Sequence, residues 1–289
     1  LDLINHVAKI GNVGIGGKNP VRIMGIINAS PESFYKKSIN TSKTLIKNTA
    51  KLMEDQGADF IDVGGMSTAP YRSTSVSEKT ESKRIQNAIK IIQNFTNLPI
   101  SVDTCRAKVA KDALEYGVEI INDISGLKYD KNMPDVISEY NPSLILCAYS
   151  QKPVNGNHLT ITKKLLQDSI NLAKKSHIPT KKIVLDPAIG FFRKTGQGSF
   201  FTKIKSDWLE RDLFILKNLN SIKKNYPLLV SVSNKSFIGK ILEKENPNDR
   251  LFGSISAEVV SVMNGADIIR THNVDATKDA VTIASKLSK

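Results

Sequence analysis

The sequence predicts an α/β protein, a single (β/α)₈ barrel of the TIM-barrel type that follows a short N-terminal hairpin. Three observations predict this fold. Short β-branched runs alternate with amphipathic helical segments, most of the runs end in a polar residue, and no linker or composition break interrupts the 289 residues. Strands that alternate with helices pair in parallel through right-handed crossovers, and eight such units close into a barrel. An open doubly wound sheet with a few extra strands is the alternative.

The N-terminal segment, residues 1–21, is expected to form a small hairpin at the foot of a barrel that spans residues 22–289. Its Gly-rich run, KIGNVGIGGK at 9–18, resembles a dinucleotide-binding loop in composition. That loop follows a strand and opens a helix, whereas this run precedes a strand. A hairpin is therefore the better interpretation.

Eight short apolar runs are the expected strands. In chain order they are residues 22–28, 60–63, 100–103, 119–123, 144–148, 183–186, 229–233 and 267–272. The helices expected between them include residues 42–56, 77–95, 106–116, 161–176, 207–221 and 251–264. In segment 106–116, Val109, Ala113 and Tyr116 recur at spacings of 4 and 3, the period of one helix face.

The net charge of +13 raises the possibility of a nucleic-acid partner. The lysines, however, are spread over the expected helices in pairs such as Lys163-Lys164 and Lys223-Lys224, and only 6% of the residues are aromatic. Solvated helix faces therefore explain the charge better than a nucleic-acid groove does. A small anionic substrate would still be attracted to such a protein.

Two features indicate the compartment. The two cysteines, Cys105 and Cys147, are too few for a disulfide framework and favour the reducing cytoplasm. No run approaches the ~20 apolar residues of a membrane span, and the first residues have no secretory pattern. We therefore expect a cytoplasmic protein without a membrane partner.

Polar side chains stand at the ends of most expected strands, where a barrel carries its chemistry. A single polar end can be a helix cap, but a set that converges on one rim favours a ligand site. The residues are Asn28, Asp62, Asp103, Asn122-Asp123, Cys147-Ala148-Tyr149, Asp186, Lys235 and the pair Arg270 and His272.

These residue types predict two adjoining pockets. Asp103, Asn122 and Asp186 offer coplanar donors and acceptors that suit a heterocycle with an amino-amide edge. Arg270 and His272 are two residues apart on the last strand and point the same way. With Asn28 on the neighbouring first strand and Lys235 at the end of the seventh, they predict an anion pocket.

The strand-end segments are similar to those of the dihydropteroate synthase family. They occur in the family's order and cover nearly the whole expected barrel. The segments are MGIINASPESF (24–34), ADFIDVGGMST (58–68), SVDT (101–104), INDISG (121–126), LDPAIGF (185–191), SNKSFIG (233–239), RLFGS (250–254) and IIRTHNV (268–274).

This resemblance implies a transferase of folate biosynthesis that joins (7,8-dihydropterin-6-yl)methyl diphosphate to 4-aminobenzoate, or a related arylamine, and releases pyrophosphate. It implies that Asp103, Asn122 and Asp186 hold the pterin edge and that Lys235 bonds the ring from the side.

The resemblance also implies an arylamine subsite and a pyrophosphate subsite. Ser236 would meet the arylamine carboxylate, and Phe191 would pack on its ring. Arg270, His272 and Asn28 would meet the pyrophosphate, with Asn28 near a Mg²⁺ ion. Lys235, Arg270 and His272 are the expected catalytic residues. Asp62 is a further candidate substrate ligand, although it also suits a role in ordering Gly64-Gly65. A homodimer is the expectation from the family.

The sequence departs from the family pattern mainly on the second-substrate side. GGMSTAPY replaces GGESTRPG, so Met66 and Ala69 stand where the family has glutamate and arginine. The first loop lacks its glycines, Ala188 replaces a glycine, and Asn234 replaces the arginine of SRKSF. A larger arylamine would fit the same data.

Two other functions remain compatible with the sequence. A methyltetrahydrofolate-corrinoid methyltransferase has a similar barrel and pterin pocket, but has no use for an anion pocket at Lys235, Arg270 and His272. A non-catalytic pterin-binding paralogue is allowed by the altered loops.

Overall fold

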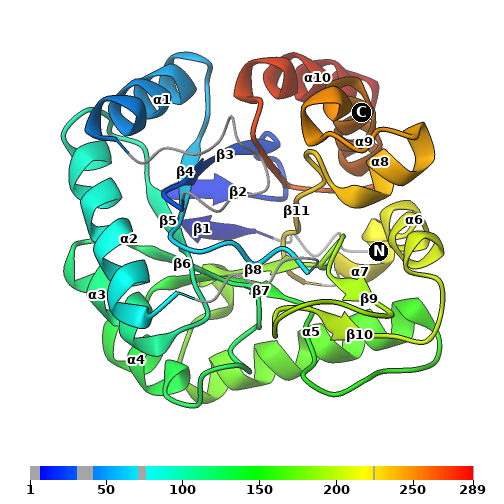
Figure 1. Ribbon diagram of the computed structural model, residues 1–289, viewed down its shortest axis with the longest axis horizontal. Helices are drawn as coiled ribbons and strands as arrows, with labels where there is room; N and C mark the ends of the chain where they lie inside the picture. The colour runs from blue at the N-terminus through cyan, green and yellow to red at the C-terminus, as the bar shows by residue number, and fades with distance from the viewer. Residues whose placement is uncertain (1–6, 31–41, 71–75, 224, 289) are drawn as a thin grey trace.

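The centre of the molecule is a ring of eight parallel strands (Figure 1). The computed structural model describes residues 7–30, 42–70, 76–223 and 225–288. The sheet order is β11-β12-β3-β4-β5-β6-β7-β8, and a parallel bridge between Leu185 and Leu228 brings its two edges together. The strands are β3 (Arg22–Asn28), β4 (Phe60–Gly64), β5 (Ile100–Asp103), β6 (Ile120–Asp123), β7 (Ser143–Cys147), β8 (Ile183–Asp186), β11 (Leu229–Val230) and β12 (Ile268–Thr271). The predicted barrel is confirmed.

Helices cover the outside of this ring (Figure 1). Their apolar faces pack on the outward-facing strand residues in one continuous core. The helices are α1 (Lys43–Asp55), α2 (Glu78–Gln93), α3 (Ala107–Glu115), α4 (Met133–Tyr140), α5 (His158–Lys175), α6 (Trp208–Lys217), α7 (Leu219–Lys223), α8 (Ser236–Leu242), α9 (Leu251–Met263) and α10 (Val274–Leu287). None of the described helices combines the length and apolar character needed to cross a membrane.

Three of the predicted elements differ from the structure by more than a shift of one or two residues at an end. The helix expected from residue 161 begins at His158, because the Asn157 side chain caps it by accepting a hydrogen bond from the Thr160 N–H. The helix expected over 207–221 is divided into α6 and α7 at Asn218, whose φ of −118° is not helical. Strand β11 pairs over only two residues, because the chain then turns toward Lys235.

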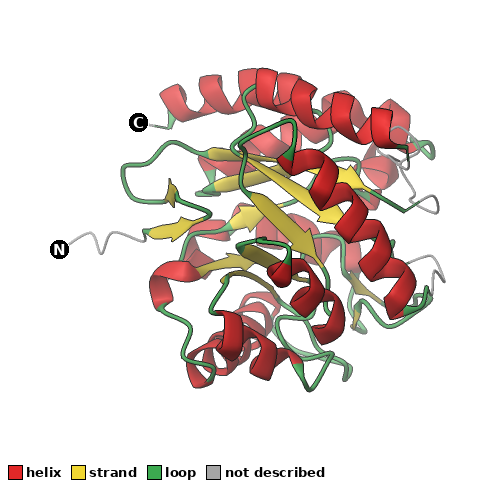
Figure 2. Ribbon diagram, turned by 90° about the vertical axis from the view of Figure 1, so that its left-hand side faces the viewer, coloured by secondary structure: helices red, strands yellow, loops and turns green. Residues whose placement is uncertain are grey.

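The N-terminal segment contributes an antiparallel pair, β1 (Ala8–Ile10) and β2 (Val13–Ile15). Figure 2 shows this pair at the end of the barrel away from the arrowheads of the parallel strands. The hairpin side chains and one inward residue from most of the strands form a separate apolar cluster there, which we call the foot cluster. Its members are Ala8, Ile10, Ile15, Met24, Phe60, Ile120, Ile145, Val184, Leu229 and Ile268. The foot is therefore filled, and the polar strand ends lie at the opposite rim.

Candidate active site

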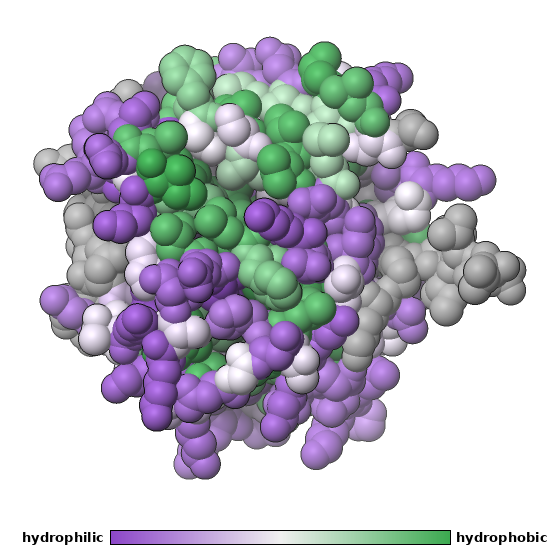
Figure 3. All heavy atoms as spheres, turned by 90° about the vertical axis from the view of Figure 1, so that its right-hand side faces the viewer, coloured by the Kyte–Doolittle hydropathy of each residue, from purple (hydrophilic) through white to green (hydrophobic). Residues whose placement is uncertain are grey.

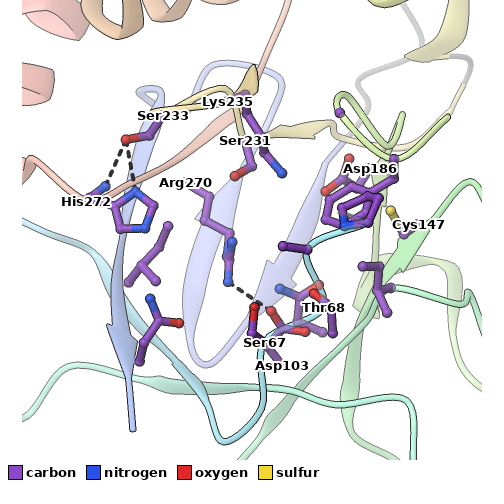
Figure 4. A pocket seen from close by; sticks show the side chains of 18 of the residues that line it. Ser67, Thr68, Asp103, Cys147, Asp186, Ser231, Ser233, Lys235, Arg270 and His272 are labelled. Atoms are coloured by element: carbon purple, nitrogen blue, oxygen red, sulfur yellow. Dashed lines mark hydrogen bonds and ion pairs between the residues drawn. The ribbon is translucent and has the colours of Figure 1, made fainter. Parts of the chain in front are cut away.

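The polar strand ends converge on one cavity at the rim (Figure 4). Of the residues predicted to bind substrate or to act in catalysis, Asp62 alone among these described residues does not line it; this carboxylate is fully buried beneath the cavity floor. The other predicted residues, all of which line the cavity, are Asn28, Asp103, Asn122, Asp186, Phe191, Lys235, Ser236, Arg270 and His272.

Arg270 links two carboxylates at the floor of the cavity. Its Nε donates to Asp62 Oδ2 at 2.6 Å, and its Nη2 donates to Asp103 Oδ2 at 3.0 Å. Asn122 Nδ2 donates to the same Asp62 oxygen at 3.2 Å. We expected Arg270 to stand with His272 and Asn28 around an anion, whereas its guanidinium reaches across to the carboxylates of the ring pocket. Asp62 is fully buried and Asp103 is partly buried, so both carboxylates need a nearby cation, which accounts for this reach.

Asp103 and Asp186 face the cavity from β5 and β8. Burial raises the pKa of Asp103 to about 7; the Arg270 charge opposes this shift and the Asp62 charge adds to it. Burial likewise raises the pKa of Asp186, and the Ala188 N–H opposes the shift by donating to Asp186 Oδ1 at 2.7 Å. Both carboxylates therefore titrate closer to neutrality than an exposed aspartate does.

Lys235 lines the cavity together with Asp103 of β5 and Asp186 of β8, and it contacts Phe191. Its Nζ lies 4.1 Å from the centroid of the Phe191 ring, a cation–π contact. Burial and the Arg270 charge together lower the pKa of Lys235 to about 8, against the opposing effect of the Asp186 carboxylate. Gly190 makes room for this side chain, since its φ is +88° and a Cβ there would lie 3.0 Å from Lys235 Cδ.

His272 lies on the other side of Arg270 and contacts Ser233. Its Nδ1 is 3.1 Å from Ser233 Oγ, which also accepts a hydrogen bond from the His272 backbone N–H (Figure 4). Burial and the Arg270 and Lys235 charges lower its pKa to about 3. His272 is thus a neutral imidazole at neutral pH. The positive charge of the predicted anion pocket comes from Arg270 and Lys235.

Sequence reasoning missed two serines of the cavity wall. Ser231 and Ser233 both line it, and their spacing of two residues was a signal that they point the same way. Asp123, predicted with Asn122 as a strand end, turns away from the cavity: its carboxylate accepts from the Ser125 and Leu127 N–H groups and orders the next loop.

The altered loops can be followed only in part. Residues 31–41 of the first loop and 71–75 of the second lie outside the described residues. Two departures from the family pattern prove to be backbone positions in the left-handed region, Ala188 with φ +61° and Asn234 with φ +58°. Asn234 is buried, and its backbone oxygen accepts from Arg250 Nη1 at 3.0 Å. Asparagine tolerates this conformation better than most residues, so its presence here has a structural reason.

Comparison with known proteins identifies the family and the fold. Residues 24–272 match the family model described as pterin binding enzyme. The dihydropteroate synthase of Clostridium beijerinckii is 36% identical over 272 residues, which cover 92% of this chain and 94% of that protein. The chain belongs to the dihydropteroate synthase family. Its function is accordingly that of a dihydropteroate synthase, a transferase of folate biosynthesis.

Solved dihydropteroate synthases have the same architecture. That of Coxiella burnetii in complex with pteroic acid superposes with a TM-score of 0.82 at 34% identity and covers 98% of both chains. That of Xanthomonas albilineans with 4-aminobenzoic acid gives 0.83 at 25% identity, again over 98% of both chains. The dihydropteroate synthase barrel is therefore present over nearly the entire chain.

The donor set limits how a metal ion could be held. Within the described part of the chain, no three His, Cys, Asp or Glu side chains are grouped as a metal site. Asn28 offers one amide oxygen at the cavity wall. Mg²⁺ is commonly bound by few protein oxygens together with substrate phosphates, so the residues fit an ion that arrives with a diphosphate.

Proposed function

We propose that this rim cavity joins the methylene carbon of (7,8-dihydropterin-6-yl)methyl diphosphate to the amine of 4-aminobenzoate. A C–N bond forms, the C–O bond to the diphosphate breaks, pyrophosphate leaves and the amine loses one proton. The observation that carries this proposal is the adjacency of a carboxylate-lined ring pocket and partly buried cations on one rim: Asp103 and Asp186 beside Arg270 and Lys235.

The pterin edge suits the side chains that end β5, β6 and β8. The carboxylates of Asp103 and Asp186 accept N–H bonds, and Asn122 can both donate and accept. Asn122 and Arg270 are already bonded to Asp62 in the free protein. The ring pocket is thus organised before substrate arrives, which reduces the free energy lost on binding.

The leaving pyrophosphate suits the opposite wall. Arg270 and Lys235 stabilise the charge that grows on the departing oxygen, and the His272 imidazole donates or accepts according to its tautomer. Asn28 would hold Mg²⁺ together with the diphosphate, and this ion would supply electrostatic stabilisation of the leaving group. Loss of the leaving group in a water-poor cavity is the step that these residues promote.

The arylamine suits the loop side of the cavity. Phe191 offers a ring face, and Ser236 at the start of α8 offers a hydroxyl for the carboxylate. In this arrangement the amine points toward the pterin pocket. No covalent intermediate with the protein is required.

Turnover tests this proposal. Purified protein incubated with the pterin diphosphate, Mg²⁺ and 4-aminobenzoate is expected to release pyrophosphate and form dihydropteroate. Tight pterin binding without pyrophosphate release, with any arylamine, would favour a non-catalytic paralogue instead. Methyl transfer from methyltetrahydrofolate to a cobalamin would favour the corrinoid methyltransferase, which the cavity-lining cations Arg270 and Lys235 argue against.

We also propose that the protein forms a homodimer through α8, α9 and α10. Figure 3 shows hydrophobic side chains gathered on the face that carries these helices. Of the eleven exposed large hydrophobic residues in the described chain, seven lie on them: Ile241, Leu242, Phe252, Val260, Met263, Ile283 and Leu287. A contiguous apolar face of this kind favours a protein interface. Phe252, 79% exposed, stands out from it.

Light scattering tests the dimer. The unmodified protein is expected at twice the chain mass of 31.8 kDa, and Phe252→Glu is expected to shift it to the monomer. Asn87→Glu, on the exposed surface of α2 and away from these helices (Figure 1), adds the same single negative charge and should remain dimeric. A monomeric unmodified protein would overturn the proposal.

A further inference from the structure

We propose that Glu258 of helix α9 is a positioning residue for the leaving-group side of the cavity. It acts through Thr277 of α10 and Thr271 of β12. The second threonine lies between the cavity residues Arg270 and His272, so holding it in place holds both. The inference rests on the proposed function, because these two residues form the wall that meets the pyrophosphate.

Helix α9 is polar on its inner face and apolar on much of its outer face. Its buried residues are Ser254, Glu258, Ser261 and Val262. Its exposed large hydrophobic residues are Phe252, Val260 and Met263. A surface helix of a globular protein usually has the reverse distribution. The inward polar side chains of α9 therefore have a role other than apolar packing.

Glu258 is the residue of this inner face that costs most to bury. Its side chain is fully buried, and within the described part of the chain its Oε1 has no hydrogen-bond partner. Burial raises its pKa to about 7, and hydrogen bonds from Thr277 and Thr271 oppose the shift. A buried carboxyl group with an unsatisfied oxygen lowers stability. Its presence is explained where it contributes to activity instead.

A chain of hydroxyl groups connects Glu258 to the end of β12. Thr277 Oγ1 lies 2.8 Å from Glu258 Oε2 and 2.9 Å from Thr271 Oγ1. Thr271 Oγ1 also accepts a hydrogen bond from the Asn273 N–H at 3.1 Å. The chain therefore joins β12 to α9 and α10, which pack side by side (Figure 1).

Glu258 sets the direction of this chain. Each hydroxyl has one proton to donate. An ionised Glu258 accepts the Thr277 proton, and Thr277 then accepts the Thr271 proton. A protonated Glu258 donates to Thr277 instead, and the chain persists in the reverse direction. A side chain that can accept or donate at this position therefore keeps the three residues connected.

The position of Thr271 determines that of its neighbours in the cavity. Successive side chains of a strand point to opposite faces, so Arg270 and His272 face the cavity while the fully buried Thr271 faces the helices. His272 also lies within the turn that the Asn273 N–H closes on Thr271 Oγ1. A shift of Thr271 would thus move both cavity residues relative to the ring pocket.

The test compares two replacements of Glu258. Glu258→Leu removes both oxygens, whereas Glu258→Gln keeps an acceptor and a donor. Pyrophosphate release at saturating 4-aminobenzoate and Mg²⁺ gives kcat/KM for the pterin diphosphate. We expect this value to fall ~10-fold in the Leu variant, because small displacements of catalytic groups are costly, and to stay within ~3-fold in the Gln variant. The KM for 4-aminobenzoate should change less than ~2-fold in both.

Stability should not follow activity. The midpoint of urea unfolding is expected to be no lower in the Leu variant than in the unmodified protein, because a buried unsatisfied oxygen is removed. Amide hydrogen exchange of residues 268–274 gives a local measure that does not depend on turnover. Exchange there should be faster in the Leu variant and unchanged in the Gln variant.

A second pair of variants tests the connection itself. Thr277→Val removes the linking hydroxyl and should lower kcat/KM as Glu258→Leu does, whereas Thr277→Ser keeps it and should not. Combining Glu258→Leu with Thr277→Val should lower kcat/KM little further, since both act through one chain. Ser261→Ala is the matched control, because Ser261 is buried on the same face and donates to the Ala257 carbonyl within α9. It should leave kcat/KM unchanged.

The outcomes separate this inference from the proposed function. Normal kcat/KM in the Glu258→Leu and Thr277→Val variants of an active enzyme would overturn the role of Glu258. Equal losses in the Leu and Gln variants, or a loss that accompanies a lower unfolding midpoint, would also overturn it. If the Leu variant does not fold, the two Thr277 variants decide the same question. An unmodified protein that releases no pyrophosphate would overturn the proposed function, and hydrogen exchange at 268–274 would still show whether Glu258 holds this segment.

Discussion

The two sides of the cavity are built differently. On the ring side, Asp103, Asn122 and Asp186 end strands of the barrel sheet, and Arg270 joins Asp103 to the fully buried Asp62. On the arylamine side, residues 66–70, Phe191 and Ser236 belong to loops or to the first turn of a short helix. The departures from the family pattern lie mostly on this second side.

This difference has a physical basis. A strand residue is fixed by hydrogen bonds to the strands on both sides. A charged side chain there also depends on its partner of opposite charge, as Asp62 depends on Arg270. A loop residue has fewer neighbours that depend on it. The ring side therefore has little freedom to change, whereas the arylamine side can be altered one residue at a time, as the exchanges at Met66 and Ala69 illustrate.

The largest expected effect comes from the cation that joins the ring side. Arg270→Ala is expected to lower kcat/KM by at least ~30-fold, or ~2 kcal/mol of barrier, because a transition-state donor is lost. It also leaves the buried Asp62 without its cation, so the melting temperature should fall. Thr68→Ala on the loop side is the comparison and should change kcat/KM less than ~5-fold. A normal rate for Arg270→Ala would contradict the assignment of the leaving-group pocket.

A ring-side carboxylate should affect pterin binding alone. Asp186→Asn replaces a charged acceptor with a neutral one, and we expect pterin affinity to fall by ~10- to 100-fold, the range for a hydrogen bond to a charged group. The KM for 4-aminobenzoate should stay within twofold. Calorimetric titration with the pterin diphosphate checks the first value. A larger change in the arylamine KM than in pterin affinity would break the division between the two sides.

The pH dependence should report ring-side groups. The pKa of Asp103 is raised to about 7 and that of Lys235 is lowered to about 8. The pterin edge needs the ionised carboxylate and the leaving group needs the cation, so kcat/KM for the pterin diphosphate should rise as pH approaches 7 and fall above 8. Neither limb should come from His272, whose pKa lies near 3. A limb near pH 6.5 that disappears in His272→Gln would contradict this prediction.

The smallest expected effect concerns Ala188. This buried residue has φ +61°, a conformation that costs a non-glycine residue roughly 1–2 kcal/mol. Ala188→Gly relieves that cost but loses a buried methyl group of about 0.8 kcal/mol and some chain entropy. We therefore expect the free energy of unfolding to change by less than ~1 kcal/mol. Ala113→Gly, inside helix α3, gains no such relief and should lose more than ~1 kcal/mol. Urea unfolding compares the two, and an equal loss would show that the backbone of Ala188 is unstrained.

Sequence patterns predicted the barrel because each strand end is a local signal. Runs such as 100–103 and 183–186 are apolar and end in an aspartate, and the structure has strands with the same bounds. The pocket lining was predictable for the same reason, since parallel strands bring their ends to one rim. Ser231 and Ser233 carried a usable period-two signal that was overlooked.

Other features depend on long-range contacts that no local pattern encodes. Asp62 and Arg270 are 208 residues apart in the chain, and the reach of the guanidinium to Asp103 follows from which charges are buried together. The neutral state of His272 likewise depends on the Arg270 and Lys235 charges around it. The hydrogen bond from Arg193 to Ser236 joins the short strand β9 (Phe192–Arg193) to the start of α8, 43 positions later in the chain.

The foot cluster has a consequence for how such an enzyme can evolve. Ile10, Ile15, Phe60 and the other members of the foot cluster contain no ionisable group. The packing at the foot therefore does not depend on which substrate is bound at the opposite rim. Inherited changes in the arylamine loops can accumulate without compromising that anchorage. The hairpin thus allows related proteins to change their arylamine substrate while the barrel stays folded.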